Sequence, residues 1–141
     1  MRLALALLLA LPAASCTTES NHRPIGLDEG APTLATAVEA WEVVEAGQVV
    51  GTVVVFEVDG TGERFFQVRN PHQQELGMVD AEGRWWRYDP HADEPEWLGT
   101  GTVREGICRL LGAGPEAPFY DVPLATLRDE ARVRDAGASQ N

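Results

Sequence analysis

Residues 41–70 read WEVVEAGQVVGTVVVFEVDGTGERFFQVRN, and this stretch decides the fold. It holds three runs of β-branched, aromatic and other apolar residues, which predict strands over residues 41–45, 48–58 and 64–70. The linkers between the runs, Ala46-Gly47 and the DGTG of residues 59–62, have the composition that tight turns require. The middle run is apolar on both of its sides, which indicates a strand at the centre of a sheet or bent around a barrel. Strands joined by such short turns predict an antiparallel meander.

After residue 70 the alternation of strand and turn continues and then gives way to helix. Further strands are predicted over residues 75–80, 84–89 and 96–100. Thr102 and Glu105 have the spacing of a capping box, and apolar residues at helical spacing follow as far as Gly112, so we expect a helix between these points. A second, superficial helix is expected from about Asp121 to about Arg134.

These elements define one domain. Residues 34–135 are expected to form a mainly β (α+β) fold, a small antiparallel meander or half-open barrel of about five to six strands closed by a C-terminal helix. Residues 136–141 are expected to be a frayed tail.

Glycine recurs in one context along the predicted strands. Val50-Gly51, Leu76-Gly77 and Leu98-Gly99 each place an apolar residue before a glycine. A glycine in a strand relieves crowding where the strand twists or bulges, so we interpret these three as structural.

The beginning of the chain has the features of an export signal. Residues 1–16 read MRLALALLLALPAASC, in which an apolar run follows Arg2 and small residues lead to Cys16. The run is far shorter than the about 20 residues that a membrane-spanning helix needs. The stretch resembles the signal peptide of a bacterial lipoprotein, with a lipobox-like Ala13-Ala14-Ser15 before the cysteine.

The resemblance implies a location in the cell envelope. Residues 1–15 would be a cleaved signal peptide and Cys16 would carry the lipid that anchors the protein. Because Thr17 rather than Asp follows Cys16, the resemblance implies attachment to the outer membrane, facing the periplasm. Ala13-Ala14-Ser15 also fits ordinary signal peptidase cleavage, which would release a soluble exported protein.

Two further expectations depend on this leader. Residues 16–33 are polar and interrupted by proline and glycine, so they are predicted to be a flexible tether. The chain has two cysteines, Cys16 and Cys108. If Cys16 is acylated, Cys108 is left as a free, partly buried thiol, which we favour; otherwise a disulfide between the two is possible.

Composition excludes several functions. The chain has 11 basic residues, all arginine, against 22 acidic ones, which gives a formal net charge of −11 and argues against binding to nucleic acid. Serine occurs only at Ser15, Ser20 and Ser139, outside the predicted domain, and lysine does not occur at all. Neither a Ser-His-Asp hydrolase nor a lysine-based mechanism is therefore expected. We predict a protein that is not an enzyme and has no cofactor.

Two groups of residues are candidates for binding. Trp85, flanked by Arg84 and Arg87, could stack on a sugar ring or anchor a protein partner if its side chain is exposed. The acidic stretch of residues 89–96 alternates carboxylates with a histidine and could hold a divalent cation, although two prolines fit an exposed turn better; its candidate ligands are Asp89, His91, Asp93 and Glu94.

The sequence therefore favours a non-catalytic envelope lipoprotein. Its β domain would contact another envelope protein or peptidoglycan. The alternative is a β domain in the periplasm that binds a small ligand or a divalent cation.

Overall fold

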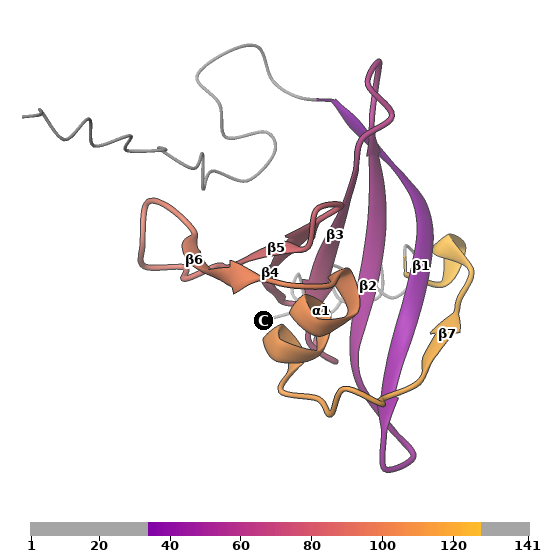
Figure 1. Ribbon diagram of the computed structural model, residues 1–141. Coiled ribbons are helices and arrows are strands. Elements are labelled where there is room, and N and C mark those ends of the chain that lie inside the picture. Colours follow the sequence, from indigo (N-terminus) through magenta and orange to yellow (C-terminus); the bar gives the residue numbers. More distant parts are fainter. Residues whose placement is uncertain (1–33, 128–141) are drawn as a thin grey trace, which may run out of the picture.

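Residues 34–127 are the part of the chain that the computed structural model describes, and they form a seven-stranded antiparallel sheet with a helix packed on it (Figure 1). The strand order is β6-β5-β4-β3-β2-β1-β7, so six consecutive strands form a meander and β7 returns to the free edge of β1. The elements in chain order are β1 (Ala35–Glu45), β2 (Gln48–Val58), β3 (Arg64–Arg69), β4 (Glu75–Asp80), β5 (Arg84–Arg87), β6 (Glu96–Thr100), α1 (Val103–Leu111) and β7 (Phe119–Asp121).

The predicted mainly β, antiparallel fold with a helix towards the C-terminus is confirmed. The sheet is open and has more strands than expected, because β7 was not predicted. β1 begins at Ala35 rather than at residue 41, since the end of β2 extends far enough to pair Ala35 with Val58. β5 ends at Arg87 rather than at residue 89, where the chain enters the turn that begins at Asp89.

Local sequence sets the limits of α1. The hydroxyl of Thr102 accepts a hydrogen bond from the amide of Glu105 at 3.1 Å, as an N-cap does. At the other end Gly112 has a left-handed conformation with φ 68°. Its amide donates a hydrogen bond to the Arg109 carbonyl, one of the carbonyls in the last turn that have no partner within the helix. No helix within residues 34–127 is long and apolar enough to cross a membrane.

The second predicted helix begins at Leu124, and its first turn extends to Leu127. The remainder, residues 128–134, lies outside the described residues. So do the predicted signal peptide, tether and tail, together with Cys16.

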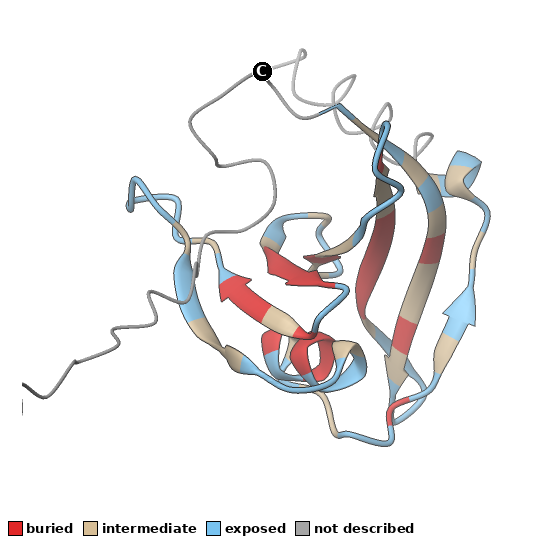
Figure 2. Ribbon diagram, turned by 45° about the horizontal axis from the view of Figure 1, so that its top comes forward, coloured by how far each residue is buried: buried red, intermediate tan, exposed pale blue. Residues whose placement is uncertain are grey.

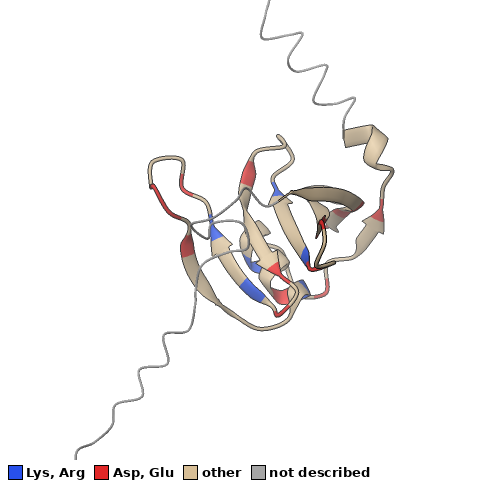
Figure 3. Ribbon diagram, turned by 90° about the horizontal axis from the view of Figure 1, so that it is seen from above, with Lys and Arg blue, Asp and Glu red and all other residues tan. Residues whose placement is uncertain are grey.

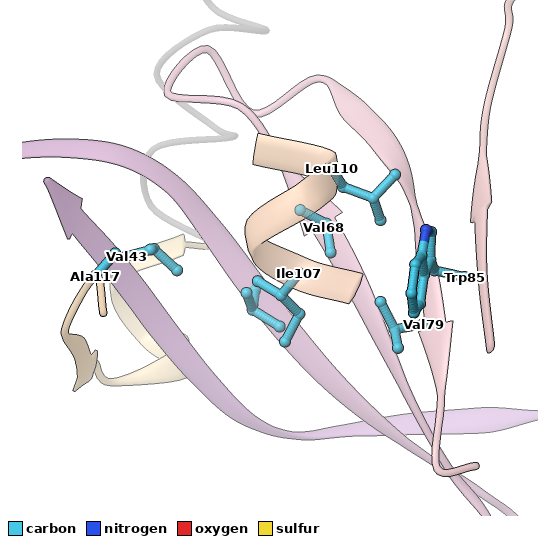
Figure 4. Packing of buried hydrophobic residues seen from close by; sticks show 8 residues of the cluster. Val43, Val68, Val79, Trp85, Ile107, Leu110 and Ala117 are labelled. Carbon is cyan, nitrogen blue, oxygen red and sulfur yellow. The ribbon is translucent and has the colours of Figure 1, made fainter. Parts of the chain in front are cut away.

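The hydrophobic core lies between α1 and one face of the sheet. Figure 1 shows a strongly coiled sheet, in which β4 to β6 turn away from the direction of β1 and β2 and α1 lies in the angle between them. Figure 4 shows Ile107 and Leu110 of α1 directed at strand side chains, and Figure 2 shows that buried positions are concentrated on α1 and the central strands. The buried cluster is Val43, Val53, Val68, Val79, Trp85, Ile107, Leu110 and Ala117.

The three glycines that follow apolar residues each lie beside a β-bulge, as predicted. Strand register shifts occur between Val43 and Val44, between Val68 and Arg69, and between Trp85 and Trp86. The residues passed over on the opposing strands are Val50, Leu76 and Leu98, each directly before its glycine. Two of these glycines lie under α1, where an added Cβ would meet Leu111 at Gly51 and Leu110 at Gly77. The bulges coil the sheet and the missing side chains let α1 approach it.

Candidate functional site

The strand register divides the sheet into two faces, because residues paired across antiparallel strands point to the same side. One face carries Val43, Val53, Val79 and Trp85 and packs against α1. We call the other the aromatic face and define it by residues on the side away from α1: Ala40, Val54, Phe56, Phe65, Met78, Trp86 and Trp97.

Trp85 is not a surface residue, and this corrects the predicted binding surface. It is 7% exposed and belongs to the core cluster. Its indole lies beside Gly106 of α1, where an added Cβ would be 3.0 Å from Cε3 of the ring, and Figure 4 shows the ring next to Val79. α1 covers the side of β5 that the sequence analysis took to be exposed to solvent.

The two arginines predicted to flank that surface lie on different sides of the sheet. Arg87 is exposed and pairs with Gly77, on the α1 side. Arg84 lies on the aromatic face, with the carbon of its guanidinium 5.8 Å from the ring centre of Trp86. The structure therefore does not bring Trp85, Arg84 and Arg87 together as one surface.

The exposed indole on the aromatic face belongs to Trp97, in edge strand β6. Trp97 pairs with Trp86 and is 43% exposed. At the opposite edge, Tyr120 of β7 is 54% exposed and pairs with Glu42 of β1. Large exposed aromatics thus mark both edges of this side of the sheet.

Arg84 is held in place by the turn between β4 and β5. Asp80 is buried, and its carboxylate accepts hydrogen bonds from the amides of Glu82 and Arg84 at 3.0 and 2.9 Å. The guanidinium of Arg84 forms ion pairs with Asp80 and with Glu82. A buried carboxylate that is paired and hydrogen-bonded in this way fixes both the turn and the arginine over Trp86.

Polar groups gather where β3 passes into β4. Gln73 donates from Nε2 to the hydroxyl of Thr52 at 3.2 Å. Burial and, as the smaller cause, the nearby carboxylate of Glu75 together raise the pKa of Tyr88 to about 12. Burial also raises the pKa of Glu75, while Arg69 acts to lower it. Partial burial is the main cause of both shifts.

The predicted cation ligands do not form a site. Asp89, His91, Asp93 and Glu94 are all exposed, and the carboxylate of Asp89 accepts a hydrogen bond from the amide of His91 at 2.9 Å. This is an Asx turn between β5 and β6. Among residues 34–127, no three His, Cys, Asp or Glu side chains come together as they would around a metal ion. The acidic stretch is a solvated turn, the interpretation that the two prolines favoured.

An open hollow of about 440 Å³ lies on the solvent side of α1. The hollow is lined by Thr102, Arg104, Glu105, Cys108, Arg109, Ala113 and Pro115. Arg104 donates to the carbonyls of Pro115 and Ala117, and its guanidinium carbon lies 4.6 Å from the ring centre of Phe119. This arginine therefore holds the connection between α1 and β7 against the sheet, which is a structural use.

Cys108 is a free thiol that is 3% exposed, more deeply buried than predicted. Burial raises the pKa of its thiol; Arg104 acts to lower it and Glu45 to raise it. A buried thiol with a raised pKa is a poor nucleophile.

We expect Cys108 to react far more slowly with a small aromatic disulfide reagent in the native protein than in the unfolded chain. The measurement uses the Cys16→Ser variant at pH 8, with and without denaturant, so that a single thiol is followed. Equal rates in the two states would show that the thiol is accessible and would contradict this description.

The comparisons with known proteins give no relative. Neither protein-family models nor curated proteins nor solved structures provide a match to this chain.

Proposed function

We propose that this protein is a lipid-anchored, non-catalytic domain of the bacterial envelope that binds another envelope protein through its aromatic face. The observation that carries the proposal is the edge of this face at β6, where the exposed Trp97 pairs with Trp86 and the guanidinium of Arg84 lies over the Trp86 ring. Tryptophan and arginine are the residues that most often dominate the energetics of protein interfaces. An exposed ring beside a guanidinium that the β4–β5 turn already holds gives a partner a preorganised contact.

Charge favours a protein over peptidoglycan as the partner. The chain carries a net charge of −11, and Figure 3 shows acidic positions spread over the ribbon among fewer basic ones. Peptidoglycan carries many carboxylates, so it would be repelled by this domain. A protein surface that presents an apolar patch with a basic rim would be attracted.

The proposed anchor comes from the sequence alone. The apolar run of residues 1–15 and Cys16 support export and lipid attachment, and outer-membrane attachment facing the periplasm is part of the same proposal. A diacyl anchor is sufficient for stable attachment, since one acyl chain alone binds a membrane only marginally.

The anchor and the surface can be tested in the same cells. A photoreactive amino acid at position 97 should crosslink one discrete envelope protein, whereas the same residue at position 109, exposed on α1, should not. Replacing Cys16 by serine should move the protein out of the membrane fraction and weaken that crosslink.

Each other outcome has a defined meaning. A position-97 adduct that sediments with purified sacculi would assign the surface to peptidoglycan. Equal crosslinking from positions 97 and 109 would show that the aromatic face is not the binding site for the partner. Retention of the Cys16→Ser protein in the membrane fraction would contradict the proposed lipid anchor.

A further inference from the structure

β6 is the edge of the sheet that a further strand can join. Within residues 34–127 it pairs with β5 alone, whereas β2 to β5 each have a strand on both sides. The opposite edge strand, β7, has three residues and lies between Pro118 and Pro123, which have no amide hydrogen to donate. β6 has five residues, Glu96–Thr100, and Trp97 in it is 43% exposed. An edge strand of this length presents backbone groups to a chain that lies beside it.

The backbone of Thr100 is directed to the outer side of β6. In an antiparallel ladder, pairs that exchange hydrogen bonds alternate with pairs whose N–H and C=O groups point away from each other. The amide of Gly101 donates to the carbonyl of Gly83 at 2.8 Å. Thr100 and Arg84 form the next pair of the ladder, so the N–H and C=O groups of Thr100 point away from β5.

The same alternation directs the backbone of Trp97 outwards. The amide of Tyr88 donates to the carbonyl of Leu76 at 2.9 Å. Two residues back along β5, Trp86 is therefore directed at β4, where it pairs with Met78. Trp97 lies opposite Trp86 on β6, so its N–H and C=O groups are on the side away from β5. Two positions of β6 thus direct their backbone groups to the edge at which the sheet ends.

We propose that β6 receives one extended, basic segment of the partner protein as an added strand. This inference rests on the proposed function and deepens it, because it states how the partner meets the aromatic face at Trp97. Backbone hydrogen bonds along the edge give affinity, and the side chain opposite Trp97 gives specificity. That side chain lies on the aromatic face, since paired residues point to the same side. A large apolar or arginine side chain at this position packs on the exposed indole.

The charge around the edge selects a basic segment. The loop between β5 and β6 carries the exposed carboxylates of Asp89, Asp93 and Glu94, and Glu96 begins the strand. Figure 3 shows acidic positions along this loop, which projects from the sheet. A strand beside β6 passes next to them, so lysine or arginine at its matching end is attracted. A second copy of this chain would bring the same carboxylates and a further charge of −11, which disfavours it as the occupant.

A bulge in β6 limits which chains can be added. A register shift leaves Leu98 without an opposing residue on β5, so Trp97 and Thr100 are three residues apart rather than two. A regular strand does not match both positions, and Pro95 has no amide hydrogen with which to extend the ladder. These features protect the edge from pairing with arbitrary chains. The added strand is therefore short and has a bulge or an end of its own opposite Leu98.

The first test uses the purified full-length protein without a partner. Amide hydrogen exchange is followed by NMR at individual residues. The amide of Thr100 should exchange nearly as fast as in an unstructured chain, whereas the amide of Gly101, which is bonded to Gly83, should exchange slower by about tenfold or more. Equal protection of the two amides would show that the edge is already paired in the free protein and would overturn the proposal.

Crosslinking in cells tests the partner segment. A photoreactive amino acid at position 97 or at position 100 should link to one partner protein, at sites within about five residues of each other in a segment that contains lysine or arginine. The same residue at position 120, on the opposite edge, should not link to that segment. Links from positions 97 and 100 to separate segments, or to a segment without basic residues, would overturn the added strand and leave the proposed function standing. A link to a second copy of this chain would overturn both.

A backbone substitution separates strand pairing from side-chain contact. Thr100→Pro removes the outward amide, whereas Thr100→Val keeps it and serves as the matched control. Because that amide points away from β5, its loss leaves the β5–β6 pairing intact, and the two variants should have the same circular dichroism spectrum. The crosslink from position 97 should fall about tenfold in Thr100→Pro and stay unchanged in Thr100→Val.

The outcomes distinguish this proposal from the proposed function. Equal crosslinking from position 97 in the two variants would overturn the added strand, while the proposed function fails when position 97 gives no discrete partner at all. If Thr100→Pro does not keep the wild-type circular dichroism spectrum, the crosslink sites from positions 97 and 100 in the otherwise unaltered chain decide.

Discussion

Replacing Trp85 by alanine is expected to destabilise the domain by about 3–5 kcal/mol, the range for removing a large aromatic from a core. The ring fills the space between β5 and α1, where Gly99 and Gly106 both lie against it. No other described side chain is placed to fill the volume, because Val79 and Ile107 are already fully packed in the same cluster. The measurement is equilibrium unfolding in guanidinium chloride, followed by far-ultraviolet circular dichroism so that the lost fluorophore does not matter.

The matched control is Trp97→Ala, on the neighbouring strand. Trp97 is 43% exposed, so its removal should change the free energy of unfolding by about 1 kcal/mol or less. A small effect at position 85 together with a large one at position 97 would reverse the assignment of the two tryptophans to core and surface. The pair thus tests the correction that the structure makes to the predicted binding surface.

Local signals in the sequence predicted the parts of the fold that depend on neighbouring residues. The Thr102 cap and Gly112 fixed both ends of α1, and Ala46-Gly47 takes positive φ values of 49° and 77° in the turn between β1 and β2. Apolar residues before glycine marked three of the bulges, where the glycine gives the strand local room, whereas the bulge at Val38 in β1 has no glycine and no such signal. Each of these features involves backbone groups within a few residues of one another.

Elements that depend on distant pairing were missed. β7 has three residues, preceded by Pro118 and followed closely by Pro123, and becomes a strand only by pairing with Trp41 to Val43 far back in the chain. The first half of β1 consists of alanine, threonine, valine and glutamate and is extended because β2 is long enough to pair with it. Intrinsic β propensity is weak evidence where such tertiary pairing decides.

The candidate site was mispredicted for a related reason. Alternation along residues 84–88 correctly separates Trp85 from Trp86, but it cannot say which side α1 will cover. Both indoles are buried, with Trp85 7% exposed and Trp86 1% exposed, so β5 does not have the usual contrast between a solvent-exposed face and a buried face. The exposed tryptophan is on the edge strand, and edge position is a property of sheet order rather than of local sequence.

Replacing Gly77 by alanine is expected to destabilise the domain by about 3 kcal/mol, at the upper end of the cost of overpacking. A Cβ at this position would lie 2.0 Å from the carbonyl oxygen of Trp86 and 3.0 Å from Cδ2 of Leu110. The leucine could rotate, but the carbonyl belongs to the backbone of β5 and can move only if the β4–β5 pairing opens. Equilibrium unfolding should show the loss, and hydrogen exchange should be fastest at the amides of β4 and β5.

Gly114→Ala is the control, because it isolates the effect of close approach from the general effect of removing a glycine. Its Cβ would approach only the carboxylate of Glu45, which accepts a hydrogen bond from the Gly114 amide at 2.7 Å and can keep it after a small shift of this flexible side chain, and its φ is not in the left-handed region. The unfolded chain loses freedom equally in both variants, a gain of about 0.4–1 kcal/mol that leaves Gly114→Ala neutral or slightly stabilised. If Gly77→Ala were as stable as this control, the bulge at Leu76 would have to absorb the added methyl group. The glycine would then reflect the twist of β4 alone, and the close packing of β4 on β5 and α1 would not require it.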